Sequence, residues 1–160
     1  MPVTVRAATE NDADAACQVL HRSIVELCGA DHQDDKEILA AWLKNKTPEH
    51  VRSWLGSANL CMIVAVRDGS VCGVAMISRQ GEIQLCYASP EVRFLGVGKL
   101  MLHTLQAQAL EWDLSEVFLT STVTGKSFYE RNGFATDGVR IRSESSAVRN
   151  VYPMVKRIGP

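Results

Sequence analysis

The chain has 160 residues, of which 46% are hydrophobic and 22% are charged, and this composition is typical of a globular domain with its own core. Lysine and arginine number 17 against 18 for aspartate and glutamate, and the basic residues form no stripe, so we expect no nucleic-acid partner. No apolar run approaches the roughly 18 residues of a membrane span and the start lacks the order of a signal peptide, so we expect no membrane partner.

The first third of the chain predicts one strand followed by helices. Residues 3–8 alternate like a strand, and a helical pattern begins after the capping residues Thr9 and Asp12. Two shorter helices are predicted next, the second beginning at Thr47 with Pro48 in its first turn. A mainly helical region therefore separates the first strand from the rest of the chain.

The middle and the end of the chain predict strands with two helices between them. Two apolar runs in residues 60–78 are joined by Asp68-Gly69, a strong hairpin signal, and a third strand, EIQLCYAS, ends before Pro90. A helix from about Gly98 to Trp112 follows, then the strand EVFLTST and a short helix that ends at Gly133. The last strands are predicted in ATDGVRIR and VYPMVKRI, with the polar loop SESSAVRN between them. The element order indicates a single α/β domain over residues 1–160.

The chain contains five cysteines, none of them in a C-x-x-C pair, and several lie within apolar strand patterns. This usage is typical of reduced, buried thiols, so we expect a cytoplasmic location. The four histidines are far apart, and neither H-E-x-x-H nor a Cys/His cluster is present, so we expect no metal site.

Glycines at one strand-to-helix junction indicate a phosphate site. Arg93-x-x-Gly96-x-Gly98 lies between a strand that ends in Ser-Pro and an amphipathic helix. Glycines at a helix start let the backbone approach an anion closely. A dinucleotide fingerprint does not fit because Met101 replaces the third glycine. A P-loop ending in GKS does not fit either, because Thr120 stands where its first glycine belongs.

The junction resembles the GCN5-related N-acetyltransferases (GNAT), whose signature is Q/R-x-x-G-x-G/A at this position. A second stretch, Ser127 to Phe134, resembles the family's helix ending in F-Y-x-x-x-G-F. The hairpin and the opening strand and helix also follow the family's element order, so the resemblance covers nearly all of the chain. It implies an α/β (α+β) fold with a central mixed, mostly antiparallel twisted sheet flanked by helices, and a splay between the two central strands.

The resemblance implies acetyl-CoA as the cosubstrate. Backbone N–H groups from Leu95 to Lys99 suit a diphosphate at a helix N-terminus, and Arg93 and Lys99 add positive charge. By position in the family, backbone groups of Cys86 and Ala88 pair with pantetheine along an exposed strand edge. The predicted cofactor site consists of Cys86, Ala88, Arg93, Phe94, Leu95, Gly96, Val97, Gly98, Lys99, Thr122 and Tyr129.

Two residues are predicted to carry the chemistry. Tyr129 matches the family's tyrosine, which implies a general acid for the departing CoA thiolate, since a phenol with a pKa near ~10 is a donor at neutral pH. The alternative is that Phe128 and Tyr129 are only packed aromatics. Glu82 resembles the catalytic glutamate of histone-acetylating members, and a two-residue period places it on one face with Cys86 and Ala88, which implies a general base. Its alternatives are a solvated acid at a strand start and a base role taken by water.

In such folds the first helices and the last hairpin loop line the acceptor groove. Glu26, His32 and Trp54 are the predicted contacts with a cationic amine, through charge and cation–π attraction. The alternatives are a solvated surface for the charged residues and a core position for the tryptophan. The acceptor is an amine of a small molecule or of a protein. A homodimer is an open alternative, because members of the family often pair.

These features predict an N-acetyltransferase that moves an acetyl group from acetyl-CoA to a primary amine by direct attack through a tetrahedral intermediate. The alternative is a non-catalytic module of the same fold that senses acyl-CoA or binds a partner. Tyr129 distinguishes the two functions, because a sensor needs no proton donor at the thiolate.

Overall fold

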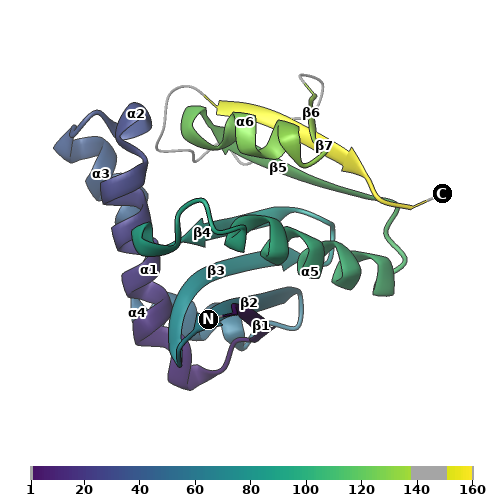
Figure 1. Ribbon diagram of the computed structural model, residues 1–160, viewed down its shortest axis with the longest axis horizontal. Helices are drawn as coiled ribbons and strands as arrows, with labels where there is room; N and C mark the ends of the chain where they lie inside the picture. Colours follow the sequence, from purple (N-terminus) through teal and green to yellow (C-terminus); the bar gives the residue numbers. More distant parts are fainter. Residues whose placement is uncertain (1, 138–150, 160) are drawn as a thin grey trace.

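A computed structural model describes residues 2–137 and 151–159, and it confirms an α/β fold in which helices flank antiparallel strands (Figure 1). In chain order the elements, with η for 3-10 helices, are β1 (Thr4–Ala7), η1 (Glu10–Asp12), α1 (Ala13–Leu27), α2 (Gly29–His32), α3 (Lys36–Leu43), α4 (Pro48–Leu55), β2 (Leu60–Arg67), β3 (Ser70–Ser78), β4 (Ile83–Ala88), η2 (Pro90–Val92), α5 (Val97–Glu111), β5 (Glu116–Thr122), α6 (Val123–Arg131), β6 (Ala135–Thr136) and β7 (Val151–Arg157). The predicted loop SESSAVRN and most of the strand predicted in ATDGVRIR lie outside the described residues.

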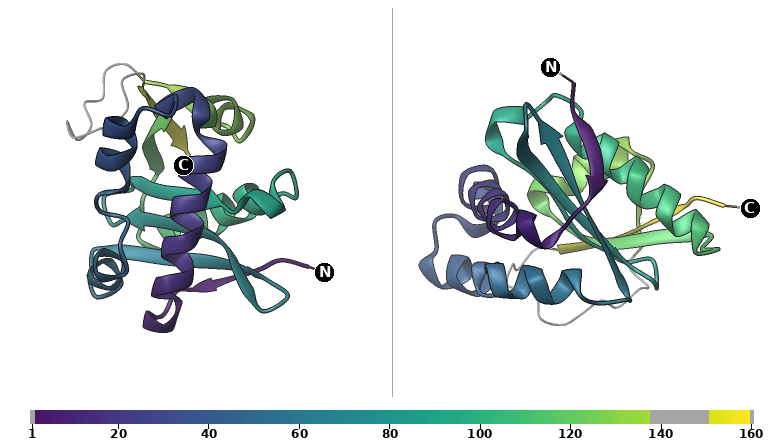
Figure 2. Two further views of the ribbon diagram at one scale, coloured as in Figure 1. Left: turned by 90° about the vertical axis from the view of Figure 1, so that its left-hand side faces the viewer. Right: turned by 90° about the horizontal axis from the view of Figure 1, so that it is seen from below.

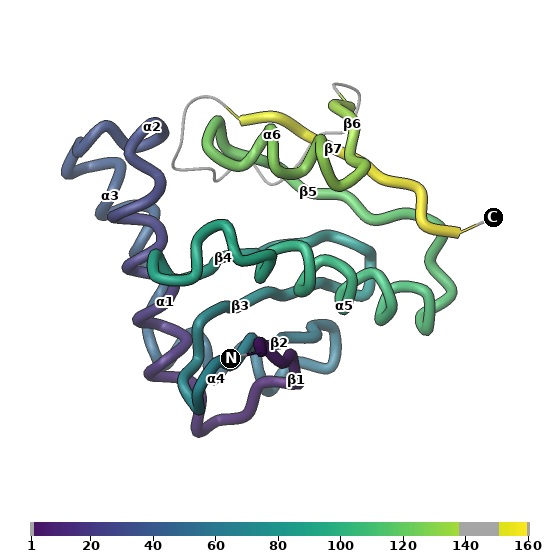
Figure 3. The backbone as a smooth tube through the Cα atoms, viewed as in Figure 1, coloured from purple at the N-terminus to yellow at the C-terminus, as the bar shows by residue number. Residues whose placement is uncertain are grey.

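The strands form two antiparallel sheets that meet at one end. β1 to β4 form the first sheet in chain order, and β7 lies between β5 and β6 in the second. An isolated parallel bridge between Glu82 and Phe118 joins the sheets, and the Phe118 N–H donates to the Gly81 carbonyl at 3.0 Å. From this contact β4 and β5 run in the same direction and separate (Figure 3). This is the splay expected between the two central strands.

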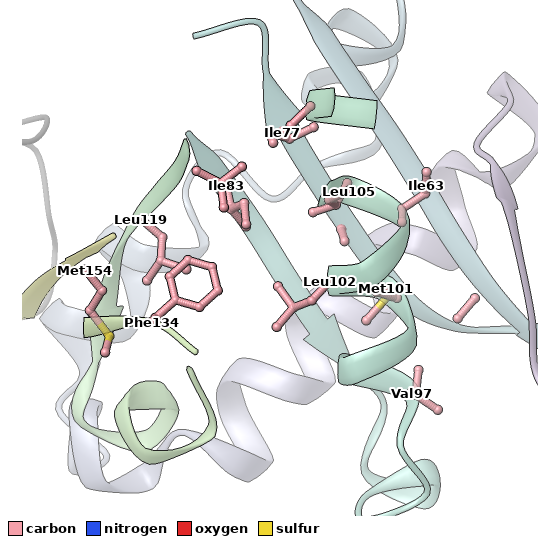
Figure 4. Packing of buried hydrophobic residues seen from close by; sticks show 14 of the residues in the cluster. Ile63, Ile77, Ile83, Val97, Met101, Leu102, Leu105, Leu119, Phe134 and Met154 are labelled. Atoms are coloured by element: carbon pink, nitrogen blue, oxygen red, sulfur yellow. The ribbon is translucent and has the colours of Figure 1, made fainter. Parts of the chain in front are cut away.

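Helices cover both faces of the first sheet (Figure 2). Strand alternation on β2 sends Met62 and Val64 toward α1 and α4, while Ile63 packs toward α5. The core under α5 continues across the splay into the second sheet, as Figure 4 shows for Met101, Leu102, Leu105, Ile83, Leu119 and Met154. One apolar core therefore holds the two sheets together while their strands separate.

A β-bulge interrupts the pairing of β3 with β4. Ile77 pairs with Ile83 but Met76 pairs with Leu85, so Gln84 is an extra residue on β4. A bulge of this kind shifts the alternation of the strand that follows it. Accordingly Ile83 packs under α5, whereas Leu85 packs in the core on the α1 side.

Candidate active site

A cavity of about 490 Å³ lies where β4 and β5 separate. It is lined from the α5 and α6 side of the sheet and also from the α1 side, so it passes between the two strands. The predicted site residues that line it are Cys86, Ala88, Arg93, Phe94, Gly96, Val97, Gly98, Lys99, Thr122 and Tyr129. The structure thus places most of the predicted cofactor site around one cavity.

The loop before α5 presents a row of backbone donors. Gly96 is the N-cap of α5 and adopts the left-handed conformation, with φ of 80°. The Leu100 N–H donates back to the Gly96 carbonyl at 3.1 Å. Within the described parts of the chain, no acceptor contacts the N–H groups of residues 96–99, as expected for the first turn of a helix. These residues line the cavity, where the helix dipole favours an anion.

Leu95 differs from its predicted role. Its N–H donates to the Val92 carbonyl at 3.1 Å, which closes a tight turn after η2. Its side chain is 55% exposed and is not part of the cavity lining. The row of donors therefore begins at Gly96 and not at Leu95.

Gly98 is required by the packing of two helices. A Cβ at Gly98 would lie 2.8 Å from Cζ of Phe128 on α6, closer than real side chains approach. The missing Cβ therefore lets α6 lie directly against the start of α5. At Gly96, by contrast, a Cβ would meet nothing within 4 Å, so that glycine serves the left-handed backbone.

Tyr129 places a phenol beside the Cys86 thiol. Its ring packs edge to face against Phe128 and Phe134, with centroids 5.1 and 5.6 Å away. Burial raises the pKa of Tyr129 well above its ordinary value, and the neighbouring Cys86 thiol adds to the rise. Burial likewise raises the pKa of Cys86 to about 12, and a hydrogen bond with the Tyr129 hydroxyl opposes part of that rise. Both groups therefore keep their protons at neutral pH.

Two threonines of β5 also line the cavity. The Thr122 hydroxyl oxygen caps α6 by accepting a hydrogen bond from the Gly125 N–H at 3.3 Å. Thr120 Oγ1 is buried and has no hydrogen-bond partner among the residues that the structure describes. A buried hydroxyl without a partner is unfavourable, so a ligand or a water molecule that bonds it gains affinity. Sequence analysis assigned no role to Thr120.

Comparison with known proteins identifies the family. The family model of the acetyltransferase (GNAT) domain matches residues 28–156. The chain belongs to the GNAT family. A comparison with curated protein sequences returns no significant match.

Solved structures of low sequence identity share the GNAT fold. The PaiA N-acetyltransferase from Thermoplasma acidophilum, in complex with coenzyme A, is 18% identical with a TM-score of 0.81, over 98% of this chain and 99% of that chain. A GCN5-related N-acetyltransferase from Rhodopseudomonas palustris is 16% identical with a TM-score of 0.85, over 98% and 96%. The ribosomal-protein-S18-alanine N-acetyltransferase from Escherichia coli is 14% identical with a TM-score of 0.70, over 99% and 96%. These likenesses confirm the fold expected from the sequence.

The α1 side of the cavity in this GNAT domain is made of residues that sequence analysis missed. Ser23, Leu27 and Cys28 line it from the end of α1, and Tyr87 lines it from β4. Burial raises the pKa of Tyr87 above its ordinary value, against a hydrogen bond with the Trp42 side chain. Ser23 is a buried polar residue within the apolar stripe of α1, and Leu27 lies one turn later. Ser23, a polar residue in the otherwise apolar stripe of α1, was the feature of the sequence that could have indicated this wall.

A carboxylate joins the α1 side of the GNAT domain to α6. Asp31 on α2 is buried, and it accepts hydrogen bonds from the Thr124 backbone N–H at 3.3 Å and from the Thr124 hydroxyl. Thr124 lies in the first turn of α6, where a negative charge is favourable. Because Thr124 also lines the cavity, this contact positions one part of the cavity wall.

His32 does not line the cavity and instead stabilises the end of α1. The side chain is fully buried, and its Nδ1 accepts a hydrogen bond from the Asp34 N–H at 2.9 Å. Its Nε2 therefore carries the proton and donates to the Ile24 carbonyl at 3.0 Å. Its two ring nitrogens are bonded within the protein, so the predicted contact with an amine is replaced by a structural role.

The other two predicted acceptor contacts also lie away from the cavity lining. Trp54 on α4 packs against the core on the α1 side, with its ring 6.4 Å from that of His50. Glu26 is exposed on α1 and forms an ion pair with Arg22. These positions match the alternatives of a core tryptophan and a solvated charge.

Glu82 lies at the closed end of the splay and is not part of the cavity lining. Its neighbour Ile83 packs under α5, so alternation turns Glu82 to the α1 face, whereas Cys86 and Ala88 pack on the α5 side. The predicted common face is wrong because the bulge at Gln84 shifts the alternation of β4.

The described ranges, 2–137 and 151–159, contain no group of three His, Cys, Asp or Glu residues placed to hold a metal ion. Within the same ranges, no helix has the length and hydropathy that crossing a membrane requires. The five cysteines are all free thiols.

Proposed function

We propose that this GNAT protein is an acetyl-CoA-dependent N-acetyltransferase that acetylates a primary amine. The observation that carries the proposal is the position of four N–H donors, at residues 96–99, and of Tyr129 along one cavity. The donors suit a diphosphate, and a phenol suits a departing thiolate. The PaiA enzyme, which has the same fold, was solved with coenzyme A, and this supports the same ligand here.

The chain's own backbone supplies most of the proposed cosubstrate site. Residues 96–99 hold the diphosphate through their N–H groups, and Arg93 and Lys99 in the lining contribute positive charge. β4 pairs with β3 on one edge, and past the closed end of the splay no described strand pairs with its other edge. Backbone groups of Cys86 and Ala88 at that edge are suited to pair with the amides of pantetheine.

Tyr129 acts as the general acid in this proposal. As the amine forms the C–N bond and the C–S bond of the thioester breaks, the Tyr129 hydroxyl gives its proton to the departing sulfur, and solvent returns the proton afterwards. Because the pKa of Tyr129 is raised, its hydroxyl stays protonated at neutral pH and is available to protonate the departing sulfur. Cys86 stays a thiol because its pKa is about 12, so it does not compete as a nucleophile.

We assign removal of the ammonium proton to water. No carboxylate is present among the described residues that line the cavity. The unpartnered Thr120 hydroxyl offers an anchor for a water molecule, since a bridging water needs polar partners. Glu82 lies outside the lining, so it is not placed in direct contact with the amine.

The amine is inferred to approach from the α1 side, because the α5 and α6 side is assigned to the cosubstrate. Ser23, Leu27 and Tyr87 then form the wall that contacts the acceptor. We also infer that the reaction takes place in the cytoplasm, because all five cysteines are free thiols.

Calorimetric titration of the purified protein with acetyl-CoA tests the proposal, with ATP as a control for general phosphate binding. The matched variant is Gly98→Val, which displaces the start of α5 from α6. We expect acetyl-CoA to bind with micromolar affinity, ATP to bind more weakly, and the variant to lose roughly tenfold or more in affinity. A panel of amines, with release of the CoA thiol as the readout, then measures transfer. Absence of acetyl-CoA binding would overturn the proposal, and binding without thiol release would favour the sensor.

A further inference from the structure

Phe94 combines two unfavourable features. Its side chain is 88% exposed, the highest fraction among the exposed large apolar side chains in the described ranges. Its backbone φ of 68° lies in the left-handed region that favours glycine. Either feature alone is unusual for a phenylalanine, and both occur in the loop that leads to the N–H donors of α5. A residue of this kind is expected to have a binding role.

Arg93 contacts the exposed ring. Its guanidinium carbon lies 4.7 Å from the Phe94 ring centroid, a cation–π contact. Both residues line the cavity. Because the ring remains so exposed beside the guanidinium, most of its apolar surface is open to a second flat group. The pair therefore presents an open aromatic ring next to a positive charge.

The position of the loop limits which group reaches this ring. Residues 96–99 define where a diphosphate lies, and Phe94 is two residues before that row. In coenzyme A the diphosphate carries the pantetheine arm at one end and a 3′-phosphorylated adenosine at the other. The arm is assigned to the space between β4 and β5, so the adenosine extends outward, past the loop that holds Phe94.

We propose that the Phe94 ring stacks on the adenine of acetyl-CoA, with Arg93 holding the ring and pairing with a phosphate of the nucleotide. This inference rests on the proposed function. An aromatic side chain stacks on the π-face of any base, so the contact selects a nucleotide-bearing thioester over a shorter pantetheine thioester. The exposure of Phe94 in the free protein then has a reason, because the ring is covered only when the cosubstrate is bound.

Two ligands and two variants test the inference. The ligands are acetyl-CoA and 4′-phosphopantetheine, which retains the arm and one phosphate but lacks the adenosine; displacement of acetyl-CoA reports its binding. Phe94→Gly removes the ring and suits the left-handed backbone, while Phe94→Trp keeps an aromatic surface. We expect Phe94→Gly to weaken acetyl-CoA binding roughly 5- to 100-fold, the effect of losing one base–aromatic stack. Its affinity for 4′-phosphopantetheine should stay within about twofold of native, and Phe94→Trp should bind both ligands like the native chain.

Three results would overturn the inference. Native affinity of Phe94→Gly for acetyl-CoA would show that the ring contacts no part of it. An equal loss for both ligands would assign the effect to the loop backbone and not to adenine. Unchanged affinities with an altered sedimentation coefficient would assign the ring to a contact between two copies of the chain. If the native chain binds neither ligand, the proposed function fails instead, which is a distinguishable result.

Discussion

The two sides of the cavity are built from different kinds of chemical group. On the α5 side, residues 96–99 present backbone N–H groups, whose positions depend on the course of the chain and not on which side chains it carries. On the α1 side, the wall is made of the side chains of Ser23, Leu27 and Tyr87, from two elements far apart in the sequence. Substitutions that preserve the backbone therefore leave the N–H groups of the α5 side in place. On the α1 side, by contrast, a single substitution changes the shape or polarity of the wall. We therefore expect most substitutions to leave the affinity for acetyl-CoA unchanged, and single substitutions on the α1 side to change which amine is preferred.

The largest effect is expected at Tyr129, the proposed general acid. Tyr129→Phe removes the hydroxyl and keeps the packed ring, so we expect kcat to fall roughly 10²- to 10⁴-fold. The affinity for acetyl-CoA, measured by calorimetry, should not change. Because burial holds the pKa of Tyr129 above its ordinary value, loss of this proton should not lower native activity at any pH up to about 10. Near-native kcat in the variant would remove the phenol from the chemistry.

The second-largest effect is expected for Gly98→Val, which tests whether close packing of α5 on α6 positions the N–H groups of residues 96–99. Gly98→Val introduces a Cβ where Phe128 Cζ would lie 2.8 Å away. We expect the free energy of unfolding, from urea denaturation, to fall by about 1–3 kcal/mol, as overpacking does elsewhere. Acetyl-CoA binding should weaken in parallel, because the start of α5 is displaced.

A second substitution separates packing from ligand contact at Gly98. Phe128→Ala removes the ring that the new side chain meets, so the double variant should lose less stability and less acetyl-CoA affinity than the sum of the two single variants. If Gly98 is needed for binding because the ligand approaches its backbone, the two substitutions will be non-additive in stability but additive in acetyl-CoA affinity.

A substitution at His32 tests whether this residue has a structural role or contacts the amine. His32→Ala leaves the Ile24 carbonyl and the Asp34 N–H without their partner, so we expect a loss of about 1–3 kcal/mol in unfolding free energy. KM for the amine should stay near native. Glu26→Gln on the exposed surface is the control and should change stability by at most about 0.5 kcal/mol. A raised KM in His32→Ala at native stability would return this residue to the acceptor site.

Leu27 offers a direct way to alter acceptor choice. It lines the cavity from α1, so Leu27→Ala should change the ratio of kcat/KM between a large and a small amine by roughly tenfold. In the proposed function the two ligands contact opposite sides of the cavity, so the Kd of acetyl-CoA should not change. Val25→Ala, at an exposed position of the same helix, is the matched control. If Leu27→Ala also changed the affinity for acetyl-CoA, the two ligands would not occupy separate sides of the cavity.

The α5 side of the cavity could be predicted from the sequence because its physical requirements are local. A left-handed turn at Gly96 and a helix directly after it are encoded within a few residues. The same holds for β2 and β3, which are continuous apolar runs in the sequence and are buried over several successive residues in the sheet. Leu95 could not be assigned in this way, because its N–H donates to Val92 in a tight turn after η2 that the sequence pattern does not indicate.

The α1 side of the cavity could not be predicted in the same way because its contacts join distant elements. The stretch around His32 is polar and reads as a surface loop, yet the ring is buried against the end of α1. The link from Asp31 to Thr124 crosses most of the chain. The bulge at Gln84 has no local signature, and it alone changes which residues of β4 share a face.

The smallest effect is expected at Glu82, where the two sides meet at the closed end of the splay. Glu82→Gln keeps the size of the side chain and removes its charge, and because the residue lies outside the cavity lining, kcat/KM should fall by no more than about threefold. The pH dependence of kcat/KM decides between the alternatives. If water removes the proton, the acidic limb of the profile reports the amine itself and persists in the variant. If the carboxylate is the base, kcat falls by roughly 10²-fold or more and that limb is lost, which would extend the acceptor side to the start of β4.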